Sequence, residues 1–369
     1  MLIYHIHWGT SGNGGLYIDE IYEALKCAGF KQEVFVSRYY PFKYGKKVFF
    51  KYSDISHCKY KGLIRNILKA FDTIYALSYI IYRSRKEKPD LINYSLVSGC
   101  FNFVILFLKC IRWVSGSRII ITCHDVLPFS RSEREEKKEM RNRDYLFKWA
   151  DYLLIHNDNS RKTLMDKFVI NPKKIIYHRF PIQDLLKLHP LYNIEKKYDF
   201  LFIGHLRKEK GVALLLESWA HFYSNYKEAR LCIAGMNISN ISIKDEYRYS
   251  NIDFKLHYIS DDDFCKLVCQ SRYVVLPYLK GTNSGIVSDV LSLGASVIAS
   301  DLPMFKDNPL LDDSNLFSAG SIDSLIKILN IKYKDTDNSN VRLKVDRYKE
   351  EFTKEVIDIY NKISDDNKK

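Results

Sequence analysis

The sequence predicts an α/β protein built from two doubly wound, Rossmann-like domains in tandem, and three observations favour this fold class. Short aromatic and β-branched runs alternate with longer apolar runs of helical spacing, which is typical of parallel strands covered by helices on both faces. The alternation lapses once near the middle of the chain and then restarts. The length of 369 residues also exceeds what one hydrophobic core usually fills.

The first half opens with a strand at 2–8, a glycine-containing loop, and a helix that begins near Leu16. Five further strands are predicted at the runs QEVFVSRYY, DLINYSL, RIIITCHD, DYLLIHND and KIIYHRF. Apolar residues at helical spacing predict helices over Leu63–Tyr82, Asn102–Trp113 and Ser160–Phe168. We therefore expect a first Rossmann-like domain over residues 1–182.

The pattern lapses at 183–197, which contains Pro190 and is interpreted as a linker. It restarts with a second domain at 198–335, whose predicted strands are YDFLFIG, ARLCIAG, IDFKLHYI, YVVLPY and ASVIASD. The segment 336–369 is polar and helical, with an apolar stripe that needs a surface to bury it. This stripe consists of Phe352, Val356, Ile357, Tyr360 and Ile363.

The charged residues are unevenly distributed along the chain. The chain has 57 Lys and Arg against 44 Asp and Glu, a net charge of +13, and residues 41–86 hold eleven basic residues against two acidic ones. Such a patch indicates an anionic partner, which could be lipid, nucleic acid or a phosphorylated substrate. The longest apolar run, at 100–108, is too short for a membrane span. With no signal peptide apparent, a cytoplasmic location is expected.

Loops that follow strands are the candidate sites, because open parallel sheets bind ligands at the carboxyl ends of their strands. Gly14 and Gly15 come after the first predicted strand, where missing side chains would let a ligand approach the backbone. Their run lacks the spacing of a dinucleotide fingerprint, and a tight turn is the alternative. His124 stands at the end of the fourth predicted strand, where a purely structural role is the alternative.

The second domain offers two further loops. In GHLRKEKG, Gly204 leads through Arg207 and Lys210 towards a helix start, where basic side chains oppose the helix dipole unless an anion is present. In the other loop, Asn283, Ser284 and Gly285 precede a helix predicted over 286–293. Free backbone N–H groups there would suit a phosphate, and Asp289 one turn later could accept ribose hydroxyls. A solvated charge run and an ordinary capped helix are the alternatives.

Taken together, these features resemble the family 4 glycosyltransferases, which have the GT-B fold of two Rossmann-like domains facing across a cleft. The likeness covers nearly the whole chain. It rests on the loop at Gly14 and Gly15, on His124, on the pattern G-x-L-x-x-x-K-G at 204–211, and on the loop and helix at 281–293, in the family's order and spacing. The helical segment 336–369 resembles the part of the family that crosses back onto the first domain.

The resemblance implies retaining transfer of a sugar from a nucleoside diphosphate donor, held by 198–335, to an acceptor held by 1–182. His124, Arg207 and Lys210 would be catalytic, with the two cations neutralising the departing diphosphate. The donor would be bound by Gly14, Gly15, Gly204, Asn283, Ser284, Gly285 and Asp289. The resemblance implies neither a metal nor a cofactor, since the cations and the helix start replace a metal ion.

Two positions depart from the family's pattern. Gly281 stands where the family usually has a glutamate that contacts the donor sugar, and His205 stands where an arginine is usual. These departures leave a catalytically silent partner subunit open as an alternative to an active enzyme. A basic nucleic-acid-binding protein is a second alternative, although no recognition module accompanies the charge.

The loop TNSG resembles that of a branch active in assembling bacterial capsule, O-antigen or exopolysaccharide. The implied acceptor is a glycan or a polyprenyl-diphosphate-linked glycan. The predicted helix Leu63–Tyr82 has basic residues near both ends, so peripheral contact of 41–86 with an anionic membrane is expected. A core helix with solvated basic ends is the alternative.

Overall fold

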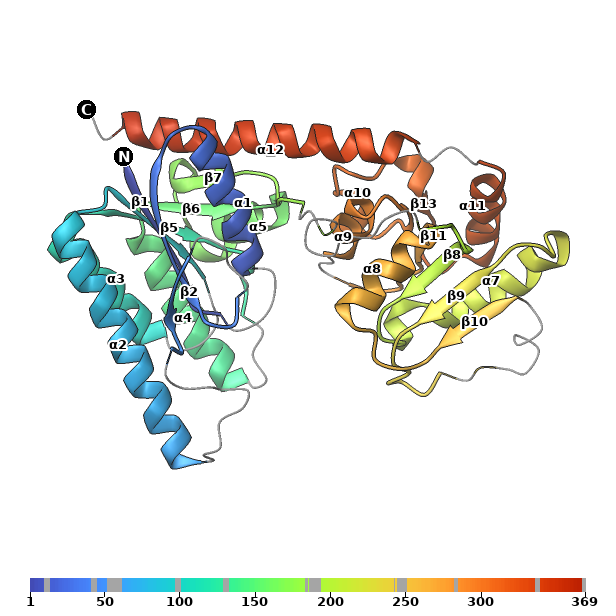
Figure 1. Cartoon of the computed structure of the whole chain (residues 1–369), viewed down its shortest axis with the longest axis horizontal. Helices are drawn as coiled ribbons and strands as arrows, with labels where there is room; N and C mark the ends of the chain where they lie inside the picture. The colour runs from blue at the N-terminus through green and yellow to red at the C-terminus, as the bar shows by residue number, and fades with distance from the viewer. Residues whose placement is uncertain are drawn as a thin grey trace. The chain divides into compact units, whose positions relative to one another are not determined.

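The structure is a computed structural model, and it describes residues 1–9, 14–40, 45–51, 62–96, 101–128, 133–182, 185, 194–241, 243, 251–281, 285–335 and 339–366. Contacts divide the chain into two compact units (Figure 1). Unit 1 comprises Met1–Pro181 and Glu351–Lys369, and unit 2 comprises Ile182–Glu350. Most of the predicted linker 183–197 lies outside the described residues.

Unit 1 contains, within its described residues, a parallel sheet of seven strands in the order β3-β2-β1-β4-β5-β6-β7. The strands are β1 (Leu2–His7), β2 (Lys31–Ser37), β3 (Lys46–Phe49), β4 (Leu91–Ser95), β5 (Arg118–Thr122), β6 (Tyr152–Ile155) and β7 (Ile175–Tyr177). The helices are α1 (Gly14–Cys27), α2 (Leu63–Glu87), α3 (Phe101–Ser115), α4 (Glu133–Trp149) and α5 (Asp158–Phe168), with a 3-10 turn at Pro172–Lys174.

Both faces of this sheet are covered. Alternate strand residues such as Ile3 and Ile120 pack with α1 and with the C-terminal helix, whereas their neighbours Tyr4 and Ile119 pack with α2, α3 and α4. The strands are therefore apolar on both sides, which explains why they read as continuous hydrophobic runs in the sequence.

Unit 2 repeats the architecture with six described strands in the order β10-β9-β8-β11-β12-β13. These are β8 (Tyr198–Ile203), β9 (Leu231–Ala234), β10 (Ile252–Lys255), β11 (Ser271–Leu276), β12 (Ser296–Ser300) and β13 (Leu316–Phe317). Helices α7 (Val212–Asn225) and α11 (Ile322–Lys334) cover one face, and α8 (Asp261–Cys269), α9 (Ile286–Ser292) and α10 (Pro303–Lys306) cover the other. Two 3-10 turns, η2 (Lys208–Lys210) and η4 (Asp313–Asn315), complete the unit.

The last helix, α12 (Ser339–Asp365), contributes to both hydrophobic cores. Val345 and Tyr348 pack into unit 2, whereas Phe352, Val356 and Tyr360 are buried in unit 1 with Ile363. The predicted apolar stripe is thus buried by the first domain, except that Ile357 is only partly buried. The fold class predicted from the sequence, two doubly wound domains with a C-terminal helix returning to the first, is confirmed.

Several elements were not predicted, and some predicted helices are longer than expected. The missed elements include β3, α4, α10, α11 and β13. Helix α2 continues from Tyr82 to Glu87, because Arg83 forms an i,i+4 ion pair with Glu87 and the chain turns only at Lys88, which adopts the left-handed conformation. Helix α3 likewise begins one residue earlier and ends two residues later than predicted.

Candidate functional sites at the carboxyl ends of the strands

The loop after β8 is held against the loop after β9 by backbone contacts. The Gly204 N–H donates to the Ala234 carbonyl at 2.9 Å, and the Leu206 N–H donates to the Met236 carbonyl at 2.9 Å. A Cβ atom at Gly235 would lie 2.0 Å from the Gly204 carbonyl oxygen, so only glycine allows this approach. The predicted donor-binding residue Gly204 therefore lies in a fixed turn.

The same loop is joined to the one after β11. Gly211 has a φ of +69° and its Cβ would lie 1.7 Å from the Pro277 carbonyl oxygen, which again requires glycine. The Leu279 N–H donates to the Glu209 carbonyl at 2.8 Å. These contacts bring η2 to the carboxyl end of the neighbouring strand, which is where doubly wound sheets bind ligands.

Lys210 is the partly buried cation of this region. Its Nζ lies 3.6 Å from the centroid of the Tyr278 ring, so the ammonium group is paired with an aromatic face. Burial, and next the nearby positive charge of Arg207, lower the pKa of Lys210. A cation held with incomplete solvation beside open loops is suited to binding an anion.

Arg207 lies in the same loop and is half exposed, with its Nη1 3.7 Å from Glu209 Oε1. His205 is also exposed. Of the predicted residues of this loop, the structure thus brings Arg207 and Lys210 within electrostatic reach of each other, and Lys210 is the more buried of the two.

Asp289 lies in the first turn of α9 and is largely shielded from solvent. Burial, and next the charge of Asp261, raise the pKa of Asp289 to about 6. Gly285, directly before α9, is exposed, whereas Asn283 and Ser284 lie outside the described residues. The region therefore places a desolvated carboxylate one helical turn after Gly285, the described residue of the predicted phosphate-binding set.

Gly281 faces Met304 of α10. A Cβ at Gly281 would lie 2.8 Å from the Met304 Sδ and 3.2 Å from its Cε. The end of the methionine side chain thus occupies space that a larger residue at 281 would need.

In unit 1, four histidines lie along the carboxyl edge of the sheet. His7 is the last residue of β1, His124 follows β5, His156 follows β6, and His178 follows β7. The rings of His124 and His156 are stacked with centroids 5.3 Å apart, and Tyr17 of α1 packs edge-on against both. We call His7, His124, His156 and His178 the histidine row.

Each member of the histidine row has one ring nitrogen with a partner. His124 Nε2 lies 3.1 Å from the Ser95 Oγ, His7 Nε2 lies 3.1 Å from the Tyr40 hydroxyl, and His178 Nε2 lies 2.6 Å from the Tyr17 hydroxyl. The other nitrogens of these three, and Nε2 of His156, are buried without a hydrogen-bond partner among the described residues.

Burial keeps the histidine row neutral. It lowers the pKa of His7 to about 4 and of His178 to about 3, and it lowers the pKa values of His124 and His156 well below the usual value. Neutral imidazoles offer a donor or an acceptor to a hydroxyl group but no charge to a phosphate.

The segment after His124 is fixed by a buried arginine. Arg143 of α4 donates through Nη1 to the carbonyl oxygens of Asp125, at 2.5 Å, and Val126, at 3.2 Å. Its Nε and Nη2 bond the Glu139 carboxylate. Arg143 therefore positions the turn that carries His124.

Of the predicted unit 1 residues, His124 lies at the sheet edge as expected, and Gly14 and Gly15 are the first residues of α1. Sequence reasoning missed His7, His156 and His178. The available signal was that each of them also ends a predicted strand, as His124 does.

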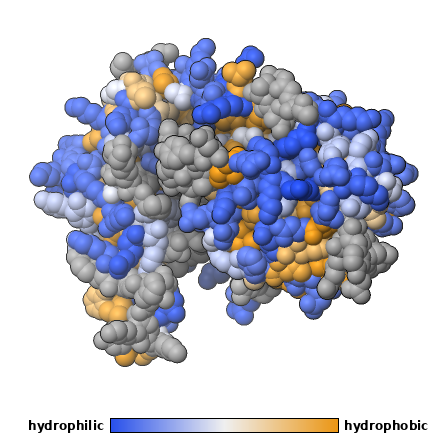
Figure 2. All heavy atoms as spheres, turned by 45° about the vertical axis from the view of Figure 1, so that its right-hand side comes forward, coloured by the Kyte–Doolittle hydropathy of each residue, from blue (hydrophilic) through white to orange (hydrophobic). Residues whose placement is uncertain are grey.

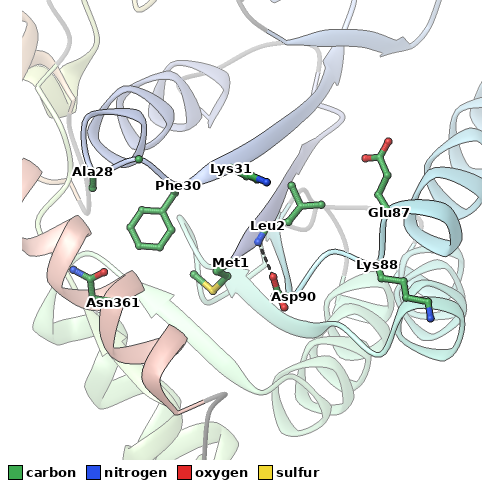
Figure 3. Close-up of a pocket in the computed structure, with 10 residues that line it drawn as sticks. Met1, Leu2, Ala28, Phe30, Lys31, Glu87, Lys88, Asp90 and Asn361 are labelled. Atoms are coloured by element: carbon green, nitrogen blue, oxygen red, sulfur yellow. Dashed lines mark hydrogen bonds between the residues drawn. The ribbon is translucent and has the colours of Figure 1, made fainter.

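Away from these strand ends, pockets, metal sites and membrane spans are the other features that would bear on function. A pocket of about 600 Å³ lies at the opposite, amino end of the unit 1 strands, lined by Leu2, Phe30, Lys31 and Asn361 among others (Figure 3). Among the described residues, no group of three or more His, Cys, Asp or Glu side chains could hold a metal ion. No helix in the described part of the chain is long and apolar enough to span a membrane.

Comparison with known proteins agrees with this architecture. Residues 197–330 match the family model of Glycosyl transferases group 1. Among curated proteins no sequence matches the chain.

Three solved structures are similar over the whole chain. Sucrose-phosphate synthase from Thermosynechococcus elongatus has 14% identity and a TM-score of 0.61, covering 98% of this chain and 99% of its own. A glycosyltransferase from Rickettsia africae has 10% identity and a TM-score of 0.60, covering 98% and 97%. A pneumococcal O-GlcNAc transferase in complex with UDP and GlcNAc has 11% identity and a TM-score of 0.60, covering 99% of both chains. The chain therefore has the two-domain GT-B fold, and its second unit matches a glycosyltransferase domain.

Proposed function

We propose that the protein is a retaining glycosyltransferase of family 4 type that transfers a sugar from a nucleoside diphosphate sugar. The observation that carries this proposal is the setting of Lys210, a partly desolvated cation between two loops that only glycine could bring together. It lies in the part of the chain that matches the glycosyltransferase model. In the proposed reaction the bond from the anomeric carbon to the diphosphate breaks and a glycosidic bond to the acceptor oxygen forms. The acceptor hydroxyl loses its proton to the departing nucleoside diphosphate.

In this proposal the cations stabilise the departing diphosphate, because charge that develops on its oxygen is best met by groups already in place. Lys210 serves this role with Arg207. Asp289 accepts the ribose hydroxyls, and Gly285 provides a backbone N–H group. Gly204, whose own N–H is bonded to the Ala234 carbonyl, contributes the tight turn beside the donor. The cations take the place of a metal ion, so that the reaction requires no metal and no cofactor. Asn283 and Ser284 remain predicted donor-binding residues.

Unit 1 would bind the acceptor, with His124 beside the transferred sugar and Gly14 and Gly15 near the diphosphate. His124 is partly exposed, and the histidine row around it is uncharged, so this edge of the sheet presents no positive charge from its histidines to the acceptor. We propose a glycan or a polyprenyl-diphosphate-linked glycan as acceptor, in the synthesis of capsule, O-antigen or exopolysaccharide. We also propose a cytoplasmic location, with contact between residues 41–86 and an anionic membrane.

A second candidate function is a catalytically silent partner subunit. The Met304 side chain beside Gly281 favours it, because a Cβ at position 281 would lie 2.8 Å from the Met304 Sδ, so the glutamate that the resembled family has there would require this methionine to move. This candidate predicts that nucleoside diphosphate binds without turnover of the donor sugar.

The experiment that tests the proposal is Lys210→Ala, with Lys208→Ala as matched control. Both lysines are in η2, but Lys208 is exposed. We expect Lys210→Ala to weaken nucleoside diphosphate binding at least tenfold in calorimetry, since a charge-assisted contact is worth about 1.5–3 kcal/mol. Lys208→Ala should change affinity less than threefold. Equal affinity of the Lys210→Ala variant and the unmodified protein would show that the phosphate assignment is wrong.

A further inference from the structure

The outward face of α2 is apolar and exposed over about five turns. Its side chains include Leu63, which is 76% exposed, and Phe71, which is 69% exposed. The full set of exposed large hydrophobic residues on this helix is Leu63, Ile64, Ile67, Phe71, Ile74, Tyr75 and Tyr82. The opposite side of α2 packs onto the unit through Ala76 and Ile80. The helix therefore has an ordinary buried face and a second apolar face in solvent.

Helix α3 packs beside α2 and extends this surface. It exposes Phe103 (64%), Leu106 (61%) and Trp113 (87%). We call the exposed hydrophobic residues of α2 and α3 the apolar platform. Figure 2 shows hydrophobic atoms at the surface in the lower part of the left-hand unit, where α2 lies in Figure 1. Soluble proteins rarely expose contiguous apolar surface of this extent without a partner.

The exposed charges on α2 and α3 themselves are positive. Arg85, Lys86 and Lys88 are exposed at the C-terminal end of α2, and Lys109 is exposed on α3. The acidic residues of the two helices are Asp72, which is buried, and Glu87, which pairs with Arg83. The platform thus joins apolar side chains to basic ones, with no exposed carboxylate within either helix.

This combination favours a lipid surface over a second copy of the chain. In a symmetric dimer the two copies of the patch carry the same positive charge, so bringing them together costs electrostatic repulsion. In an anionic bilayer, the headgroups instead attract each Lys or Arg, which contributes about 1 kcal/mol of binding free energy. The apolar side chains insert below the headgroups. Trp113, Tyr75 and Tyr82 suit the boundary between the two layers.

We propose that the apolar platform lies in the interface of an anionic membrane, with α2 parallel to the bilayer plane. This locates membrane contact on the outer faces of α2 and α3 and on Lys88, rather than on the segment 41–86 as a whole. Only the reason for this membrane contact rests on the proposed function: the contact would bring unit 1 to a lipid-linked acceptor. The test of this inference measures lipid binding alone, so failure of either proposal leaves the other standing.

The test is sedimentation of the full chain with vesicles of phosphatidylglycerol and phosphatidylcholine, compared with phosphatidylcholine alone. We expect binding to the anionic vesicles, and at least a tenfold lower partition coefficient for the double variant Phe71→Ser/Ile74→Ser. Both side chains are already in solvent, so the variant should fold normally. The matched control, Ile331→Ser/Leu343→Ser, removes two comparably exposed side chains from α11 and α12 and should bind like the unmodified protein.

A second measurement concerns Trp113 directly. Brominated lipids should quench the fluorescence of the full chain on anionic vesicles, and Trp113→Phe should remove most of that quenching. Two results would overturn the proposal. One is equal vesicle binding by the unmodified protein and the Phe71→Ser/Ile74→Ser variant, including no binding by either. The other is concentration-dependent dimerisation in sedimentation velocity that this variant abolishes, which would assign the platform to a second copy.

Discussion

At the scale of single residues, the buried carboxyl group of Asp289 makes the stability of the fold depend on pH. Burial raises the pKa of Asp289 from 3.8 to about 6, so the folded chain holds this proton more tightly than the unfolded chain. The stability from this group is therefore complete below pH 3.8 and is lost as the pH rises through about 6. We expect Asp289→Asn to raise the free energy of unfolding at pH 8 by about 1–3 kcal/mol, and to change it little at pH 4.

Denaturant unfolding at both pH values checks this, with Asp346→Asn as control because Asp346 is exposed on α12. If Asp289 also holds the ribose, the same variant must bind nucleoside diphosphate more weakly. A variant that is less stable at pH 8 would contradict the account of the buried charge.

Gly235 and Gly204 form a natural pair for testing the close approach of the two loops. Both have a φ of +136°, but a Cβ at Gly235 would meet the Gly204 carbonyl oxygen at 2.0 Å, whereas a Cβ at Gly204 would meet nothing within 4 Å. Gly204→Ala should therefore lower the free energy of unfolding by about 1–3 kcal/mol, through backbone strain alone. Gly235→Ala should lower the free energy of unfolding by at least about 2 kcal/mol more than Gly204→Ala does, because the clash forces the loops apart.

Thermal unfolding of both variants compares these losses. Equal losses in the two variants would show that the contact between the loops after β8 and β9 does not hold them together.

At the scale of elements, the strands and helices that could be predicted from the sequence are those with a clear hydrophobic pattern. Strands buried on both faces, such as β5 and β8, form continuous apolar runs, and so their existence followed from the letters alone. Helix α4 was missed because its sequence EREEKKEMRNRDYLFKW is mostly charged and its buried contacts are few. Strand β3 was missed because it is a four-residue edge strand with two lysines.

The site shows the same limit. The glycine turns and Lys210 could be predicted because they form a local motif within eight residues. The sequence showed that the members of the histidine row end predicted strands, but not that they lie together, because their proximity depends on the strand order β1-β4-β5-β6-β7. Tyr278 was likewise not predicted as a partner of Lys210, because the contact depends on hydrogen bonds between two separate loops.

At the scale of the whole molecule, the two units should differ in their response to acid. Burial lowers the pKa values of His5 and His7 from 6.5 to about 4 and of His178 to about 3. Because the folded unit resists protonation, its stability is complete above pH 6.5 and is lost as the pH falls towards 4. Each of these histidines contributes up to about 2 kcal/mol of this loss by pH 5.

The described histidines of unit 2, by contrast with the buried ones of unit 1, are exposed; they are His205, His221 and His257. Hydrogen exchange of the full chain at pH 7.5 and pH 5, corrected for intrinsic rates, should show lost protection in the strands of unit 1 before those of unit 2. Equal or reversed loss in the two units would contradict this prediction.

The central claim is that unit 2 binds a nucleoside diphosphate through Lys210. The most direct measurement is a thermal-shift panel of UDP, GDP, ADP, CDP and dTDP against the unmodified protein and the Lys210→Ala variant. The account predicts that one base raises the unfolding temperature of the unmodified protein in a concentration-dependent way, and that most of this increase is lost in the variant. No shift with any nucleoside diphosphate, or the same shift in both proteins, would contradict it.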